Sequence, residues 1–279
     1  MATAVCLATT AASAAAANDA GQDAPQATGA APAAAASAPA PICTDRPTKA
    51  NSACSVPAGD VQIETDVVNW TRLTQSGART DTILYTNPTF KYGLGTHTDV
   101  EVNIAPYATV HTRADGVTTR LGGVGDLYVR LKQRLTSDAS KTQVSLIPFV
   151  KAPTAKLGIG NKRWEGGIAL PANIPVPGGF TLTFGPEIDL LADSDGSGRH
   201  ANLVSLINIS HPVGKKVTVY AEFWNSQNLD PAGTLRQYSA DVAVTYLLTN
   251  TLQLDVGANF GLNRITPDAQ AYVGISTRF

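Results

Sequence analysis

Residues 271–279 read AYVGISTRF, and their strict alternation decides the fold. Ala271, Val273, Ile275, Thr277 and Phe279 share one parity, while glycine, serine and arginine alternate with them on the other. A period of two is typical of a β-strand with one apolar face. An aromatic side chain at the end of such a strand gains little unless its surroundings are apolar. The class of protein therefore depends on what this apolar face contacts, either a protein core or membrane lipid.

The same alternation recurs from residue 60 onward, where Gly, Asn, Asp and Pro separate the strands. Strands are expected at 61–72, 81–94, 98–111, 125–135, 142–152, 164–176, 180–191, 201–211, 216–225, 236–248, 251–262 and 269–279. Globular strands average about five or six residues, whereas a tilted strand that crosses a bilayer needs about 9–11. The lengths therefore predict an all-β fold, a closed antiparallel up-and-down transmembrane β-barrel of about 12 strands.

The links between these strands alternate in length. The odd-numbered links are longer: TQSGAR, TRADGVTTRLGG, TAKLGIGNKR, ADSDGSGRH, SQNLDPAGT and NRITPD. The even-numbered links are shorter: GLGT, TSDASK, PGG, VGKK and TN. Long outer loops and short periplasmic turns are typical of outer-membrane barrels. The pattern predicts a bacterial outer-membrane location with both the N- and the C-terminus periplasmic.

Aromatic residues on the apolar parity indicate what the apolar face contacts, since alternation alone would also fit a soluble barrel. One set falls at the expected periplasmic strand ends: Tyr92, Phe180, Tyr246 and Phe279. A second set falls near the opposite ends: Trp164, Phe223, Tyr238 and Phe260. Two aromatic girdles flank the apolar band of a membrane barrel. The apolar face is therefore predicted to contact outer-membrane lipid.

The net charge and the charged fraction of the chain limit the kinds of partner it is expected to bind. The net charge is −1 and the charged fraction 15%, below the roughly 25% of a typical soluble domain. Nothing in this balance points to nucleic acid, and no run of 18 strongly apolar residues supports a helical membrane protein. The expected partners are lipid and a small-molecule solute.

The first part of the chain differs from the strands. Residues 1–17 read as a secretory signal peptide with an A-x-A site at 12–14, although a basic n-region is missing. Residues 18–41 form an Ala/Pro-rich linker that is expected to be disordered, because its prolines oppose an Ala-rich helix. Residues 42–59 form an N-terminal segment, and residues 60–279 form the barrel.

Two cysteines lie in this N-terminal segment. Export implies an oxidising compartment, in which Cys43 and Cys54 are expected to form a disulfide. A metal site would need further ligands, and neither histidine nor another cysteine is close. No metal and no cofactor are predicted, and the segment could act as a plug in the barrel.

Two resemblances add to this interpretation. A terminal strand ending in Phe279 resembles the C-terminal signal that the barrel-assembly machinery reads, which implies that machinery as a partner during biogenesis. The stretches DRPTKANSACSVPAGDVQIE, GVGDLYVRLKQRL, PFVKAPTA and GGIALPANIPV resemble the MetA pathway of phenol degradation family. That resemblance covers about residues 43–279 and implies an outer-membrane barrel of the transporter type. It carries no binding residues across to this chain.

Charged residues of the polar parity are expected to line the lumen. A basic wall comprises Lys91, Arg130, Lys132, Arg134 and Lys151. An acidic wall comprises Glu187, Asp189, Glu222, Asp241 and Asp255. Either the two walls create a transverse field across a narrow pore, or the charges pair mutually and close the lumen, with Asp99 and Glu101 neutralising Arg130 and Lys132. Both interpretations remain open from the sequence.

Six aromatic residues share the lumenal parity: Trp70, Tyr107, Tyr128, Phe149, Trp224 and Tyr272. They could stack an aromatic or apolar solute near the mouth of the barrel. Alternatively, they are bulky filler that narrows the lumen.

Catalysis is not expected. The four histidines are scattered over strand ends, and the adjacent Ser210 and His211 point to opposite faces. The glycine-rich loops lack the following helix of a phosphate-binding motif. The predicted function is an outer-membrane channel or transporter for small, aromatic or hydrophobic solutes. The alternative is a closed structural or surface-interaction barrel without transport activity.

Overall fold

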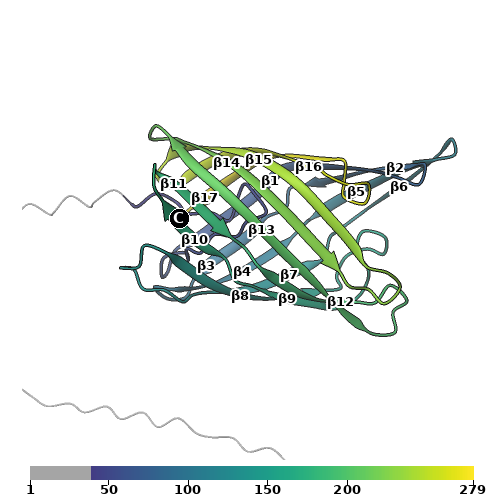
Figure 1. The fold of residues 1–279 in the computed structure, drawn as a ribbon, viewed down its shortest axis with the longest axis horizontal. Coiled ribbons are helices and arrows are strands. Elements are labelled where there is room, and N and C mark those ends of the chain that lie inside the picture. The colour runs from purple at the N-terminus through teal and green to yellow at the C-terminus, as the bar shows by residue number, and fades with distance from the viewer. Residues whose placement is uncertain (1–38) are drawn as a thin grey trace, which may run out of the picture. The chain divides into compact units, whose positions relative to one another are not determined.

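The computed structural model describes residues 39–279, which form one β-barrel (Figure 1). The predicted signal peptide and all but the last three residues of the predicted linker lie outside the described residues. Within the described part, no helix is long and apolar enough to cross a membrane.

The barrel wall consists of antiparallel strand segments joined in chain order. Their bounds are β1 (Val61–Gln75), β2 (Ala78–Tyr85), β3 (Thr89–Gly93), β4 (Thr98–Ile104), β5 (Tyr107–Ala114), β6 (Val117–Gly123), β7 (Leu127–Arg134), β8 (Gln143–Ala152), β9 (Glu165–Ala169), β10 (Ala172–Val176), β11 (Phe180–Phe184), β12 (Glu187–Ala192), β13 (Arg199–Val213), β14 (Val217–Asn228), β15 (Leu235–Thr249), β16 (Leu252–Gly261) and β17 (Ala269–Arg278). The pairs β2–β3, β4–β5, β6–β7, β9–β10 and β11–β12 each make one crossing, so the wall has twelve crossings. Strand β1 pairs with β17 and closes the barrel. The predicted twelve-stranded barrel is confirmed.

Four of the five interruptions within crossings coincide with proline. Pro88, Pro106, Pro171 and Pro186 lie in four of the five breaks, and Gly125 lies in the fifth. Proline lacks the backbone N–H that a ladder requires, which favours a break in pairing at these positions. At Pro106 the break also changes which residues face the lumen.

The two ends of the barrel differ in their connections. The end called the turn end carries residues 94–97, 135–142, 177–179, 214–216 and 250–251; the end called the loop end carries residues 76–77, 115–116, 153–164, 193–198, 229–234 and 262–268. Strict long–short alternation is therefore wrong for the first crossings. Ser76-Gly77 and Asp115-Gly116 have positive φ at both positions, as in a two-residue type I′ hairpin. Pairing therefore continues to the tips, and most of the expected loop TRADGVTTRLGG is strand.

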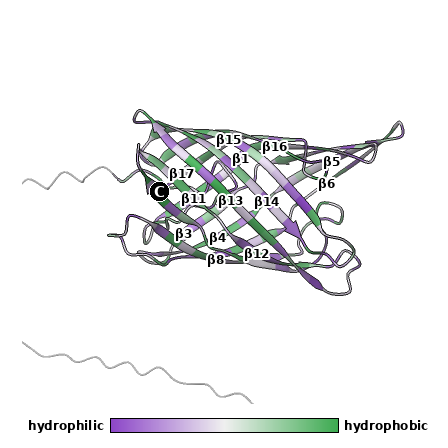
Figure 2. Cartoon of the chain, in the orientation of Figure 1, coloured by the Kyte–Doolittle hydropathy of each residue, from purple (hydrophilic) through white to green (hydrophobic). Residues whose placement is uncertain are grey.

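The barrel is polar inside and apolar outside, and Figure 2 shows both kinds of residue alternating along the strands. Large apolar side chains such as Val242, Val256 and Val273 remain about half exposed on the outer face. Lys132, Glu101 and many other polar residues are buried. All eight girdle residues named above are on the outer face, and seven of them are among its exposed large apolar side chains: Tyr92, Phe180, Tyr246, Phe279, Trp164, Phe223 and Phe260. Their placement fits a lipid-facing surface.

Candidate functional site: the barrel lumen

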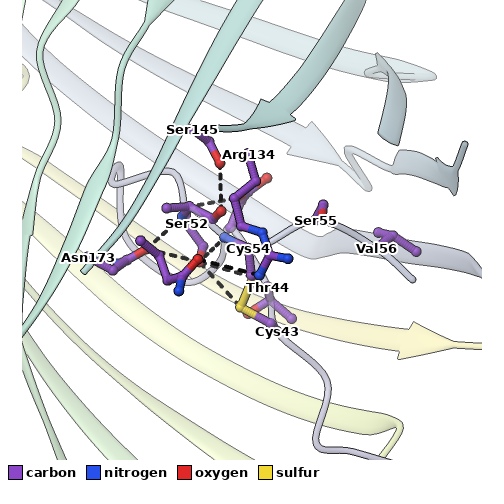
Figure 3. The surroundings of a disulfide bond; sticks show 12 residues. Cys43, Thr44, Ser52, Cys54, Ser55, Val56, Arg134, Ser145 and Asn173 are labelled. Atoms are coloured by element: carbon purple, nitrogen blue, oxygen red, sulfur yellow. Dashed lines mark hydrogen bonds between the residues drawn. A yellow bond between two sulfur atoms is a disulfide. The ribbon is translucent and has the colours of Figure 1, made fainter. Parts of the chain in front are cut away.

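Residues 42–56, called the plug, lie inside the turn-end half of the barrel. The Ile42 N–H donates to the carbonyl of Asn250 in a turn at 2.6 Å, and the Val56 N–H donates to the Asp99 carboxylate in the wall at 2.8 Å. Between these anchors, Cys43 and Cys54 form a disulfide that closes the segment into a loop (Figure 3). The chain therefore fills part of its own lumen before it enters the first strand.

Asp45 of the plug contacts the basic wall. Its carboxylate accepts hydrogen bonds from the Lys132 ammonium at 2.7 Å and from the Lys91 ammonium. Burial raises the pKa of Asp45, but the two ammonium groups outweigh it and hold the pKa well below its ordinary range. The same lysines also pair with wall carboxylates, Lys91 with Glu64 at 2.6 Å and Lys132 with Glu101 at 3.1 Å. Asp45 thus completes a buried, shared ion-pair network.

The next charged residues of the plug contact the acidic wall. The Arg46 guanidinium donates to Asp66 at 2.6 Å and to Asp255 at 2.7 Å, and its side chain passes over Gly274, where a Cβ would lie 2.1 Å from Nη2. Burial lowers the pKa of Arg46, but the two carboxylates raise it above its ordinary value. Lys49 pairs with Asp241. Adjacent residues of one segment therefore neutralise opposite walls of the barrel.

Backbone contacts fix the plug further. The Glu222 carboxylate accepts from the N–H groups of Lys49 and Ala50, both at 3.1 Å. The Asn173 side chain accepts from the Ala53 N–H at 2.6 Å, and Ser145 donates to the Ala53 carbonyl at 2.6 Å (Figure 3). These bonds satisfy backbone groups that would otherwise be buried without partners. The irregular segment is therefore held in one conformation.

The predicted basic wall divides into different environments. Lys91 and Lys132 are buried in the network around Asp45. Arg134 pairs with Asp138 in a turn, and Lys151 pairs with Glu165 at 2.6 Å toward the loop end. Arg130 lies 4.0 Å from Glu101 and lines two lumenal cavities. Lys91 and Lys151 also border these cavities, but each ammonium lies 2.6 Å from a glutamate carboxylate, so Arg130 is the least tightly paired of the three.

The predicted acidic wall divides in a similar way. Glu222, Asp241 and Asp255 hold the plug. Asp189 accepts a hydrogen bond from Asn202 at 2.8 Å, and its second oxygen is buried without a partner among the described residues. Glu187 lies beside it on the lumenal wall. These two carboxylates and Arg130 line the same cavity, which makes them candidates for contact with a solute.

Four of the six predicted aromatic residues face the lumen. Tyr128 and Phe149 form a tilted ring pair with centroids 6.5 Å apart, and Arg130 lies 6.0 Å from the Phe149 centroid. Lys49 of the plug lies over Trp224 at 5.0 Å, and Arg46 lies over Tyr272 at 5.7 Å. The first pair borders open space, whereas Trp224 and Tyr272 also support the plug.

The lumenal prediction is wrong for Trp70 and Tyr107. A register shift after Asp66 reverses the parity of β1, so Trp70 pairs across the ladder with Ile83 and the exposed Ala271. The break at Pro106 does the same for Tyr107, whose side chain is 50% exposed on the outer face. One extra residue in a strand moves every later side chain to the other face.

Three cavities follow one another through the lumen around the plug. The first, about 190 Å³, is bordered by Tyr128, Phe149, Arg130 and Glu187. The second, about 380 Å³, shares Arg130 and Glu187 with the first and extends past Trp224. The third, about 300 Å³, lies toward the turn end. Asn51 of the plug borders all three, so the plug forms part of the wall of each cavity.

Sequence reasoning missed the charges that dock the plug. These are Asp45, Arg46 and Lys49 in the plug, and Glu64 and Asp66 in β1. A signal was present, since Gln62, Glu64 and Asp66 alternate as polar residues at the start of the first strand. Their excess of negative charge requires a cationic partner inside the barrel, and the stretch DRPTK at residues 45–49 supplies cations upstream of the strand.

The described residues show no cluster of three or more His, Cys, Asp or Glu side chains that could hold a metal ion. His97 lies near Asp138 and His211 near the carbonyl of Gly178, at two different turns of the turn end, whereas His200 lies near Asp193 at the loop end. The structure therefore does not bring the histidines together.

A family comparison fits this arrangement of barrel and plug. The model of the family described as "Putative MetA-pathway of phenol degradation" matches residues 44–279, which include the plug and every strand. The chain belongs to this family. No curated protein matches the chain.

Solved outer-membrane structures are similar to this chain at low sequence identity. The COG4313 outer membrane channel from Pseudomonas putida F1 is 12% identical, with a TM-score of 0.64, covering 82% of this chain and 98% of that chain. The translocator domain of the autotransporter NalP from Neisseria meningitidis is 15% identical, with a TM-score of 0.49, covering 80% and 90%. The fold is that of an outer-membrane β-barrel.

Proposed function

We propose that the protein is an outer-membrane channel for small aromatic solutes, and that the plug sets the width of its passage. The observation that carries the proposal is the series of cavities that runs past Tyr128, Phe149 and Arg130 and around Asn51. In this proposal the turn end is periplasmic, since short turns face the periplasm in such barrels. The solved channel of similar fold and the family description agree with this function.

The solute class follows from the residues around the first cavity. Tyr128 and Phe149 present aromatic surfaces, while Arg130, Glu187 and Asp189 supply charge on the same wall. An aromatic ring with a hydroxyl or carboxylate substituent could stack on the rings and form a hydrogen bond with one of these charges. We therefore expect small, polar-substituted aromatic compounds to pass more readily than saturated compounds of equal size.

Uptake into liposomes containing the full chain tests this proposal. Phenol-sized aromatic solutes are compared with saturated cyclic alcohols of the same size. The double substitution Tyr128→Leu/Phe149→Leu should abolish the preference for aromatic solutes, because it removes the lumenal ring pair. The matched control is Tyr107→Leu, which removes an aromatic ring from the outer face and should leave the preference intact.

Two outcomes would contradict the proposal that the protein is a channel for aromatic solutes. If the wild-type chain admits no solute of either kind, the barrel is a closed structural or surface-interaction protein. If it admits both kinds equally, and the ring pair makes no difference, the barrel is a general channel and the aromatic residues are filler.

A further inference from the structure

The outer face of the loop end carries a group of arginines that the channel does not use. Arg72, Arg79, Arg113 and Arg120 lie on neighbouring strands of the β1–β2–β5–β6 ladder. We call them the arginine cluster. Figure 1 shows β2, β5 and β6 reaching far from the barrel body at the end opposite the C-terminus.

The register places the cluster on one face. Arg72 pairs with Asp81, Asp81 with His111, and His111 with Arg120 in one cross-strand row. In the next row, Arg79 pairs directly with Arg113. Residues paired across a ladder share a face, and two residues further toward the turn end that face carries Trp70 and Ile83. The arginines therefore lie on the outer surface, above the apolar wall.

Charge on this face is not balanced by the protein. Asp81 accepts from Arg72 at 2.9 Å and from Arg79 at 3.0 Å. Arg113 and Arg120 are exposed and form no ion pair with any residue of 39–279. Like charges directly opposite in a ladder are destabilising, yet Arg79 and Arg113 occupy such a pair. An anion between them would relieve the repulsion.

The height of the cluster matches a membrane surface. Asp81 lies eleven residues from Tyr92 of the turn-end girdle on the same crossing. At about 3.3 Å per residue and a tilt of about 40°, this spans about 28 Å along the barrel axis. The apolar band of such barrels is about 25 Å tall. The Arg72 side chain rests over the Trp70 ring, 4.6 Å from its centroid, as expected where an aromatic girdle meets the headgroups.

From the unpaired arginines, the register and the height, we propose that the arginine cluster binds the phosphorylated headgroup of an outer-leaflet glycolipid, lipid A in chemical class. Arginine suits this role because its planar guanidinium forms paired hydrogen bonds to phosphate. Acyl chains attached to the headgroup would lie along Trp70, Ile83, Tyr85 and Tyr107 on the wall below. A free phosphate ion would gain nothing from that apolar surface.

Binding of bisphosphorylated lipid A to the purified full chain in detergent tests the proposal, by native mass spectrometry and by titration. Each basic side chain near a charged headgroup contributes about a factor of five in affinity, so Arg79→Gln/Arg113→Gln should weaken binding roughly 30-fold. Arg236→Gln, at an outward rim position on β15 outside the ladder, is the matched control and should have no effect. Thr118→Glu keeps every arginine but places a carboxylate opposite Arg113, and it should weaken binding about five-fold.

Three results would overturn the proposal. Equal affinity for lipid A without phosphates would show that acyl chains alone are recognised. Displacement by millimolar inorganic phosphate would show a free-anion site, and equal loss in Arg236→Gln would show a diffuse charge effect. Heat-modifiable gel mobility verifies that each variant is folded. Since binding is measured in detergent without transport, this test is independent of whether the barrel conducts solutes.

Discussion

The turn-end and loop-end halves of the lumen have the same kind of wall but different contents. In the turn-end half, Lys132, Asp241 and Asp255 are bound by the plug. At mid-barrel, where the loop-end half of the lumen begins, Arg130 and Glu187 border cavities. The difference comes from a segment that precedes the first strand, so wall charges alone do not determine whether a barrel is open. Charges that hold structure and charges that meet a solute can alternate along one strand.

The largest effect on folding is expected at the turn end of the seam, which is the pairing of β1 with β17 that closes the barrel. The Phe279 N–H donates to the Val61 carbonyl at 2.8 Å, and the Val61 N–H donates back at 3.3 Å. Deletion of Phe279 removes both seam bonds and a girdle aromatic, so we expect a several-fold loss of folded protein in the outer membrane. Heat-modifiable mobility measures this yield. Phe279→Tyr keeps the bonds and a ring and should fold normally; an undiminished yield after deletion would show that the terminal residue is dispensable.

The second-largest effect is expected from Lys132→Met, which should release the plug from the barrel wall. The substitution removes one of the two ammonium groups that Asp45 and Glu101 share, with Lys91 as the other, and breaking a buried pair costs about 3–5 kcal/mol. Trypsin should then cleave after Lys49, a bond that the docked plug protects. Mass spectrometry after reduction detects the cut.

Lys141→Met is the control for this experiment, since Lys141 is exposed in a turn. It should leave Lys49 protected. Equal protection of Lys49 in Lys132→Met and in wild type would mean that the ion-pair network does not hold the plug.

A smaller effect is expected from the disulfide. Cys43→Ser/Cys54→Ser removes a crosslink between residues 11 apart, which contributes about 2–3 kcal/mol for a loop of this size. Because the ion pairs remain, Lys49 should be cleaved faster than in wild type but more slowly than in Lys132→Met. Reduction of the wild-type chain should reproduce this result. Two free thiols in protein isolated without reductant would exclude the bond.

The smallest effect is expected from substitution of Arg130, the arginine that borders the lumenal cavities. Arg130→Gln removes a cation that borders two cavities. Under a salt gradient, the reversal potential should therefore shift in the direction of greater cation selectivity. Arg134→Gln, on the same strand but paired with Asp138, should shift it much less. If both variants shift the potential equally, the distinction between solute-facing and structural charges is wrong.

The sequence predicted the barrel because alternation, strand length and aromatic girdles all follow from one chain passing between lipid and a polar lumen. It placed Arg130, Lys132 and Arg134 on one face correctly. It could not separate their roles, since the partner of Lys132 is Asp45, 87 residues earlier. Trp70 and Tyr107 were misplaced because parity counting fails after a bulge or a proline break.

Single-channel conductance of the full chain in planar bilayers tests the central claim most directly. We expect a small, non-zero conductance for the wild-type chain and a larger one for Lys132→Met, in which release of the plug widens the turn-end half. Lys141→Met should match the wild type. Absence of conductance in both the wild type and Lys132→Met would contradict the claim that this lumen is a passage narrowed by its own N-terminal segment.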